Sequence, residues 1–143
     1  MNSSKSGFYC DVLVVGGGLA ALAATISAVD NGATVLVVNK GINGKSGSSA
    51  KAAGILAAAF GHGDLQNRPV PDTPNKHARD TLEVGYHIGD PELVNFVTKE
   101  ATSAIHWLES LGVEFSRAED GGYIQLNAPG NSCPRAVSAI GGG

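Results

Sequence analysis

The sequence predicts an α/β fold with a parallel sheet, because a strand, a glycine turn, a helix and a second strand follow one another near its start. Residues 12–15 are an unbroken run of β-formers, which suits a strand covered on both faces. The glycines at 16–18 come next, and residues 19–30 are rich in the helix formers Ala and Leu, with Asn31-Gly32 as a left-handed stop. Residues 34–38 give a second β-branched strand. This order is a βαβ unit, for which parallel pairing and a right-handed crossover are expected.

Composition limits the chain to one domain, or part of one, and excludes several classes of function. Its 143 residues, 43% of them hydrophobic, can bury one core. A net charge of -3 lacks the basic excess of a nucleic-acid binder, so we expect no nucleic-acid partner. No apolar run approaches the ~20 residues of a membrane span and residues 1–10 hold no hydrophobic segment, which predicts no transmembrane segment and a cytoplasmic location. Cys10 and Cys133 form no CxxC pair, which predicts reduced thiols and no metal site.

The glycine turn has the pattern of a dinucleotide-binding, Rossmann-like domain. Six consecutive residues fit the G-x-G-x-x-G/A fingerprint: Gly16, Gly17, Gly18, Leu19, Ala20 and Ala21. Gly16 permits a tight turn, Gly18 lets backbone N–H groups approach a diphosphate, and the small Ala21 lets the helix pack closely on the sheet. The unpaired donors and the dipole at the helix start favour an anion there. We therefore predict that these six residues bind the diphosphate of a dinucleotide cofactor.

The end of the second strand provides the expected ribose contact in an unusual form. The position about 20 residues after the turn usually holds Asp or Glu, and here it holds Asn39, 21 residues after Gly18. An amide can still accept and donate one hydrogen bond to ribose hydroxyls, without the strength that a charge adds. Lys40 follows directly; we place it at the cofactor site and not on a 2′-phosphate, and a plain surface role stays open.

The segment after the second strand favours FAD over a nicotinamide cofactor. A nicotinamide dehydrogenase would continue with further βα units, whereas residues 40–55 are almost all small. Such a backbone can press against a flat ring and bond its edge, and serine hydroxyls can meet the diphosphate. A flexible linker is the alternative, which the apolar run at 55–60 weakens. The residues assigned to this part of the site are Gly41, Ser46, Gly47, Ser48, Ser49, Ala52, Ala53 and Gly54.

The second half of the chain predicts helices, a hairpin and the start of a further strand over residues 72–143. Asp90 is a good N-cap before Pro91, and Gly112 is a stop. An apolar stripe at helical spacing is expected to be core: Leu93, Val97, Ala104, Leu108 and Leu111. Residues 113–116 and 123–126 flank a glycine turn at 119–122, which predicts a hairpin. His106 and Trp107 are interpreted as packing or surface residues, and a functional role for His62, in the Gly61–Gly63 loop, is the less favoured of two interpretations.

Several motifs together resemble the flavoprotein family of succinate dehydrogenase, fumarate reductase and L-aspartate oxidase, from Asp11 to the end of the chain. Residues 46–54 are similar to the family stretch that ends in A-x-G-G-I before a small-residue helix, with Ala53 in place of the first glycine. Residues 77–81 resemble its H-x-x-D-T element, residues 90–97 its D-x-x-x-V helix, and residues 104–115 its I-x-W-L-x-x-x-G-V-x-F signature. Residues 130–135 resemble its G-H-S-x-x-R stretch, with Asn131 in place of histidine and Arg135 either on a surface strand or at an anion.

The resemblance implies a Rossmann-like FAD-binding domain, spread over residues 1–143 with 11–60 as the dinucleotide-binding and flavin-flanking part. It implies hydride transfer at flavin N5 with a small dicarboxylate or amino acid as substrate. The family's attachment histidine falls at Gly47, and no histidine lies between Asn39 and Phe60, so we expect non-covalent FAD. The resemblance places the family's capping domain and substrate residues beyond residue 143, so no catalytic residue is assigned. The chain is expected to be a fragment, a processed piece, or one subunit of a split flavoprotein that a second polypeptide completes. A nicotinamide-binding or non-catalytic structural module is the alternative.

Overall fold

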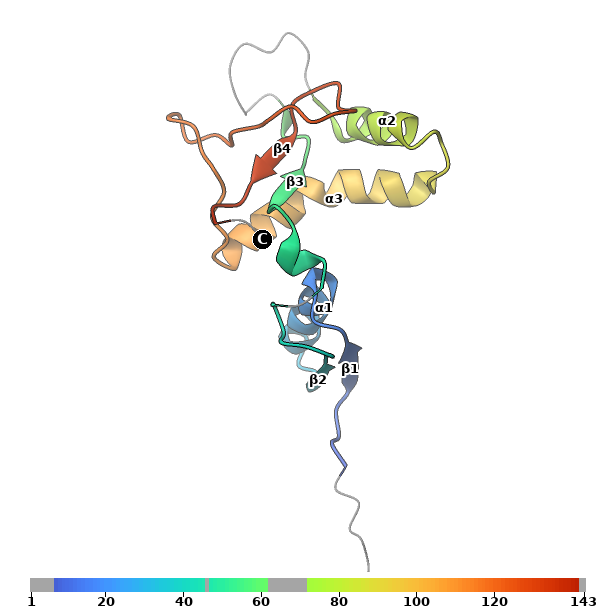
Figure 1. Ribbon diagram of the computed structural model, residues 1–143, viewed down its shortest axis with the longest axis vertical. Coiled ribbons are helices and arrows are strands. Elements are labelled where there is room, and N and C mark those ends of the chain that lie inside the picture. The colour runs from blue at the N-terminus through green and yellow to red at the C-terminus, as the bar shows by residue number, and fades with distance from the viewer. Residues whose placement is uncertain (1–6, 46, 62–71, 142–143) are drawn as a thin grey trace, which may run out of the picture. The chain divides into compact units, whose positions relative to one another are not determined.

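The computed structural model describes residues 7–45, 47–61 and 72–141, which form two compact units, 1–52 and 53–143. The first unit is the predicted βαβ: strand β1 (Val12–Val15), helix α1 (Leu19–Asp30) and strand β2 (Val35–Val38), as Figure 1 shows. β1 and β2 pair in parallel, with Val12 opposite Val35 and Val15 opposite Val38. β2 begins one residue later than predicted because Thr34 hydrogen-bonds to a side chain: its N–H and hydroxyl donate to Asp11 Oδ2 at 2.8 and 2.6 Å.

The ends of α1 confirm the sequence prediction, whereas the burial of β1 does not. α1 ends at Asp30 with Asn31 as its C-cap, and Gly32 has a φ of 83°. The sequence predicts a strand covered on both faces, yet Leu13 is 56% and Val15 78% exposed, and of β1 only Val14 is buried. That expectation is wrong for the described residues because the sheet of the first unit has two strands and one packed helix.

The second unit is built around a short antiparallel pair. Strand β3 (Ile55–Ala57) pairs with β4 (Ala136–Ser138), with Leu56 opposite Val137. The resemblance predicts a small-residue helix after Gly54, and this expectation is wrong at residues 55–57: the pairing with β4 fixes an extended backbone there. The core of this unit contains Ala58, Ile105, Phe115, Tyr123 and Val137.

Two helices that pack against each other follow β3 in the chain, and both start at the caps that their sequences provide. Helix α2 (Pro74–Val84) begins after Thr73, whose hydroxyl accepts from the Lys76 N–H at 3.1 Å. Helix α3 (Pro91–Ser110) begins after Asp90, whose carboxylate accepts from the Glu92 N–H at 2.8 Å. The Asp90 cap and the Pro91 start are confirmed.

The face of α3 that is buried differs from the predicted stripe. Thr98 and Ile105 are the buried residues of α3, whereas Leu93 and Val97 are 59% and 55% exposed. Ile105 packs in the core, and Leu108, a member of the predicted stripe, packs against it. Among the described residues the stripe is therefore confirmed as core at Leu108 and wrong at the exposed Leu93 and Val97.

The predicted hairpin is confirmed in an abbreviated form. Arg117 and Tyr123 make an isolated antiparallel bridge, and the Ala118 N–H donates to the Gly122 carbonyl at 2.8 Å. Tyr123 is buried, donates its hydroxyl to Glu109 Oε2 at 2.5 Å and stacks on Phe60. These contacts fasten the hairpin to α3.

Arg135 is the largest fully buried side chain of the described residues. Its Nε and Nη2 donate to the two oxygens of Asp72, each at 2.7 Å, and its Nη1 donates to Asp80 Oδ2 at 2.6 Å. The Ser132 N–H and hydroxyl also donate to Asp80, at 2.9 and 2.6 Å. Both interpretations of Arg135 from the sequence, a surface strand or an anion contact, are therefore wrong: its guanidinium is fully engaged inside the protein.

These contacts set the ionisation of the buried groups. Burial alone would raise the pKa of the Asp80 carboxyl, but the hydrogen bonds from Ser132 and Arg135 outweigh burial and lower this pKa to about 2. Burial lowers the pKa of the adjacent His77, and the positive charge of Arg135 lowers it further. Asp80 and Arg135 are therefore both charged near neutral pH, whereas His77 is held neutral.

The Arg135→Met variant should destabilise the chain strongly, because it leaves two buried carboxylates without their cation. We expect a loss of about 3–5 kcal/mol in the free energy of unfolding, measured by urea denaturation. Arg79→Met is the matched control, since Arg79 pairs with Glu83 on the exposed side of α2 at 3.8 Å. Such exposed pairs contribute about 0–1 kcal/mol. Equal losses in the two variants would contradict the structural role of Arg135.

Candidate cofactor-binding site

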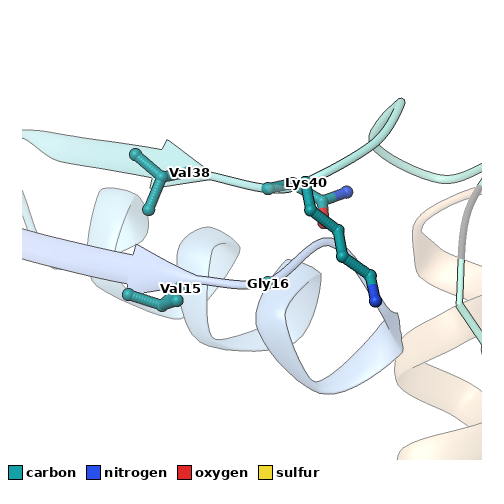
Figure 2. A pocket seen from close by; sticks show the side chains of 5 residues that line it. Val15, Gly16, Val38 and Lys40 are labelled. Carbon is teal, nitrogen blue, oxygen red and sulfur yellow. The ribbon is translucent and has the colours of Figure 1, made fainter.

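The candidate site lies where the two parallel strands of the first unit end. A cavity of about 390 Å³ is lined there by Val15 and Gly16 from one strand and by Val38, Asn39 and Lys40 from the other, as Figure 2 shows. The Gly16 N–H donates to the Val38 carbonyl at 2.8 Å, so the pairing of β1 and β2 continues to the edge of the cavity. Ligands of open α/β sheets bind outside the carboxyl ends of strands, which is the position of this cavity.

The glycine turn has the backbone that the fingerprint predicts. Gly16 has a φ of 126°, a conformation that favours glycine, and Gly18 is extended at the N-cap of α1 without a side-chain cap of its own. The Leu19 N–H, the first of the helix, donates to Ser49 Oγ at 3.2 Å. A Cβ placed on Gly16 would lie at an ordinary contact distance, 3.9 Å, from the Ala21 Cβ, so the backbone conformation and not space favours glycine there.

The middle glycine tests whether the site fits a cofactor that needs bare backbone. A Cβ on Gly17 would lie 2.3 Å from Asn39 Nδ2 and 2.7 Å from Asn43 Oδ1, both far inside contact distance. The Gly44 N–H donates to the Gly17 carbonyl at 3.4 Å, which brings the segment after β2 against the turn. The Asn39 and Asn43 side chains thus pack directly on bare backbone at Gly17, and any other residue at this position would displace them.

The residues after β2 divide into those that meet the turn and those that do not. Asn39 is half-buried with its amide over Gly17, at the place predicted for a ribose contact. Lys40 is exposed and is the one charged residue that lines the cavity; its side chain extends away from β2 toward the start of α1 (Figure 2). A single positive charge and no carboxylate among the lining residues suit an anionic ligand. Both residues lie where the sequence placed them.

The small-residue segment is only partly brought to this site. Ser49 reaches the start of α1 through its hydroxyl, whereas Gly41, Gly47, Ser48 and Ala52 are exposed in the first unit. Ser46 lies outside the described residues. The remaining two predicted residues, Ala53 and Gly54, belong to the second unit, where the Gly54 carbonyl accepts from the Ala139 N–H at 2.8 Å.

Asn43 is the residue at this site that sequence reasoning missed. Its side-chain oxygen lies over Gly17 beside the Asn39 amide, although it matches no position of the fingerprint. The available signal was local: Asn43 precedes Gly44, whose φ of 71° marks a turn that folds this segment back.

The other candidates from the sequence do not line this cavity or lie outside the described residues. His62 lies outside the described residues, and Cys10 and Cys133 are free thiols. Across 7–45, 47–61 and 72–141 no cluster of His, Cys, Asp or Glu could hold a metal ion. Neither α3 nor any other helix in those ranges combines the length and apolarity that a bilayer crossing requires.

The sequence matches the family described as FAD binding domain over residues 11–141. It is 37% identical over 114 residues to one of the subunits of the fumarate reductase (CoM/CoB) from Methanothermobacter marburgensis, covering 80% of this chain and 20% of that protein. It is 36% identical over 131 residues to the L-aspartate oxidase of Caulobacter vibrioides, covering 91% of this chain and 24% of that protein. The chain thus spans about a fifth to a quarter of the length of these relatives.

Solved structures indicate the same family. The apo form of the Mycobacterium smegmatis Sdh1 complex contains a chain that is similar with a TM-score of 0.79 and 32% identity, over 93% of this chain and 21% of that chain. These matches support a flavin cofactor and not the nicotinamide alternative. Together with the βαβ unit and its bare glycine turn, they establish that the chain belongs to the FAD-binding domain family, as the FAD-binding region of a flavoprotein of the fumarate reductase, succinate dehydrogenase and L-aspartate oxidase type.

Proposed function

We propose that this chain holds FAD without a covalent bond in an oxidoreductase that transfers hydride to or from a small dicarboxylate or amino acid. The observation that carries the proposal is the cavity at the ends of β1 and β2, next to a glycine turn in which Gly17 has no room for a Cβ. The names of the two relatives, a fumarate reductase and an L-aspartate oxidase, support this substrate class. When bound, FAD supplies a two-electron carrier that exchanges hydride at its flavin N5.

The residues of the first unit bind and orient the adenosine diphosphate half of the cofactor. The bare backbone at Gly17 and Gly18 admits phosphate oxygens to the N-terminus of α1, where the helix dipole favours negative charge. Asn39 provides an amide at the ribose position, and Lys40 adds a positive charge beside the diphosphate. No described residue is assigned a proton-transfer role, in agreement with a chain that positions the flavin.

The non-covalent attachment is supported by the residues near the expected flavin. Gly47, where the resemblance places the attachment histidine, has no side chain that could form a bond, and its φ of 88° favours glycine. No histidine occurs between Asn39 and Phe60.

A second polypeptide that completes the flavoprotein is part of the proposal. Its support is the names of a relative and a solved neighbour: the fumarate reductase (CoM/CoB) relative is a subunit, and the Mycobacterium smegmatis Sdh1 neighbour is part of a complex. The exposed apolar residues of β1 are further support, because both faces of a parallel sheet are normally covered. The cytoplasmic location stays a prediction.

Substituting the middle glycine should remove the cofactor while leaving the second unit intact. In Gly17→Ala the new methyl group displaces the Asn39 and Asn43 side chains, so we expect an FAD dissociation constant at least about tenfold higher, or roughly 1.4 kcal/mol. Quenching of flavin fluorescence measures it. Gly89→Ala is the control, since its Cβ would meet only Val94, at an ordinary 3.9 Å. Unchanged FAD binding in Gly17→Ala would contradict the assigned site.

The attachment and the reaction are tested on the purified chain together with any polypeptide that co-purifies with it. We expect the purified protein to show a flavin absorption band. When acid precipitates the protein, all of the flavin should pass into the supernatant. The flavin of the assembly should be bleached by succinate or L-aspartate, or, once reduced, reoxidised by fumarate. Flavin that stays with the precipitate would contradict the non-covalent attachment, and an assembly that holds FAD without reacting with any of these three compounds would contradict the proposed substrate class.

A further inference from the structure

The sequence contains two Asn-Gly pairs, Asn31-Gly32 and Asn43-Gly44, and both lie in the first unit. An asparagine before glycine is chemically labile, because glycine has no Cβ that keeps its backbone nitrogen away from the asparagine side chain. All four residues are exposed, so water and hydroxide reach both pairs alike. A difference in reactivity between the two pairs therefore depends on the contacts that their amide groups make.

The pair at the end of α1 is held by hydrogen bonds. Asn31 Nδ2 donates to the Ser27 carbonyl at 2.8 Å, and the Gly32 N–H donates to the Val29 carbonyl at 2.9 Å. Both distances are those of ordinary hydrogen bonds. The two groups that would react with each other, the side-chain amide and the next backbone nitrogen, are thus both engaged by the end of the helix. This pair provides a protected reference within the same unit.

The pair after β2 lies against the glycine turn and is held less firmly. The Lys45 N–H donates to the Ile42 carbonyl at 3.1 Å, which closes an exposed turn around the pair. The Gly44 N–H reaches the Gly17 carbonyl only at 3.4 Å, longer than an ordinary hydrogen bond. Asn43 Oδ1 lies over Gly17, where a Cβ would be 2.7 Å from it. The nitrogen that can attack is therefore weakly engaged, and the side chain that would change belongs to the cofactor site.

We propose that Asn43 is a site of deamidation, and that this modification removes FAD from the chain. The Gly44 backbone nitrogen attacks Asn43 Cγ, and the new bond between these atoms closes a succinimide ring. The Cγ–Nδ2 bond breaks, and ammonia leaves with the proton of the Gly44 N–H. Water then opens the ring at either of its carbonyl carbons, which gives aspartate or isoaspartate. Water is the only co-reactant, and no atom is oxidised or reduced.

Both products weaken the cofactor site for physical reasons. Each adds a negative charge beside Gly17, at the turn that the proposed function assigns to the diphosphate, and like charges repel. Lys40 is the one charged residue that lines the cavity, so the new carboxylate offsets its charge. Isoaspartate also lengthens the backbone by one carbon atom at Asn43, which moves the segment relative to the turn. The inference rests on the proposed function and adds a modification that regulates the same site.

The test is to incubate the purified, cofactor-free chain at mildly alkaline pH, where the backbone nitrogen loses its proton more readily, and to follow both pairs by peptide mass spectrometry. Trypsin cleaves after Lys40 and Lys45, so the peptide 41–45 contains Asn43 as its only asparagine. The mass change is the one that replacement of NH2 by OH produces. We expect it at Asn43 at least about tenfold faster than at Asn31, because firmer hydrogen bonds have to break there.

The effect on the cofactor is measured on the modified chain after ion exchange has separated it from the unmodified chain. Its FAD dissociation constant, followed by flavin fluorescence, should be at least about tenfold higher. Asn43→Asp places the charge without incubation and should raise the constant by a similar factor of about ten. Asn31→Asp is the matched control, since it adds the same charge at the opposite end of α1 from the cavity and should bind FAD as the unchanged chain does. Circular dichroism checks that both variants are folded.

Two results would overturn the inference: deamidation at Asn43 no faster than at Asn31, or modified and Asn43→Asp chains that bind FAD as tightly as the unchanged chain. An unmodified chain that binds no FAD would contradict the proposed function, and with it the effect of the modification on FAD. The rates of deamidation are read from the mass alone, so they decide whether Asn43 is the labile site even in that case.

Discussion

The absence of a side chain at Gly17 is the constraint on which the cofactor site depends. Asn39 and Asn43 lie so close over this residue that a Cβ would overlap both. This arrangement brings the end of β2 and the segment after it against the start of α1. The alternation of strand, turn and helix matters for function because it delivers these groups to one edge of the sheet.

The second unit depends on a different kind of interaction, the buried ion pairs of Arg135. Asp72, Asp80 and Arg135 come from segments far apart in the sequence, and together they fasten α2 to the strand that ends the described chain. Removing one partner of such a cluster is costly, whereas forming it stabilises the fold little beyond an apolar core. Its value here is to specify one arrangement of α2, β4 and the loop at Ser132. The motif residues at 77–81 and 130–135 thus have a common structural explanation.

Local patterns predicted the elements well, because their signals lie within a few residues. The ends of α1, the cap of α3 at Asp90 and the parallel pairing of β1 and β2 follow from glycines, a capping aspartate and runs of valine. Non-local contacts could not be predicted in this way. The residues next to Arg135 in the sequence do not indicate that it is buried against Asp72. β3 is a strand because it pairs with the distant β4. Asn43 approaches Gly17 only after the chain turns at Gly44. Leu93 and Val97 of the α3 stripe are exposed, because periodicity reports that a face is apolar, and not what covers it.

The affinity of the chain for FAD compared with FMN tests the central claim most directly. The first unit is assigned to the adenosine diphosphate half of the cofactor, which FMN lacks. Titration of the purified chain, followed by flavin fluorescence, should give a dissociation constant for FMN at least about tenfold above that for FAD, and ADP should displace FAD. Equal affinities for FAD and FMN, with no competition by ADP, would show that the glycine turn at the ends of β1 and β2 does not hold the nucleotide.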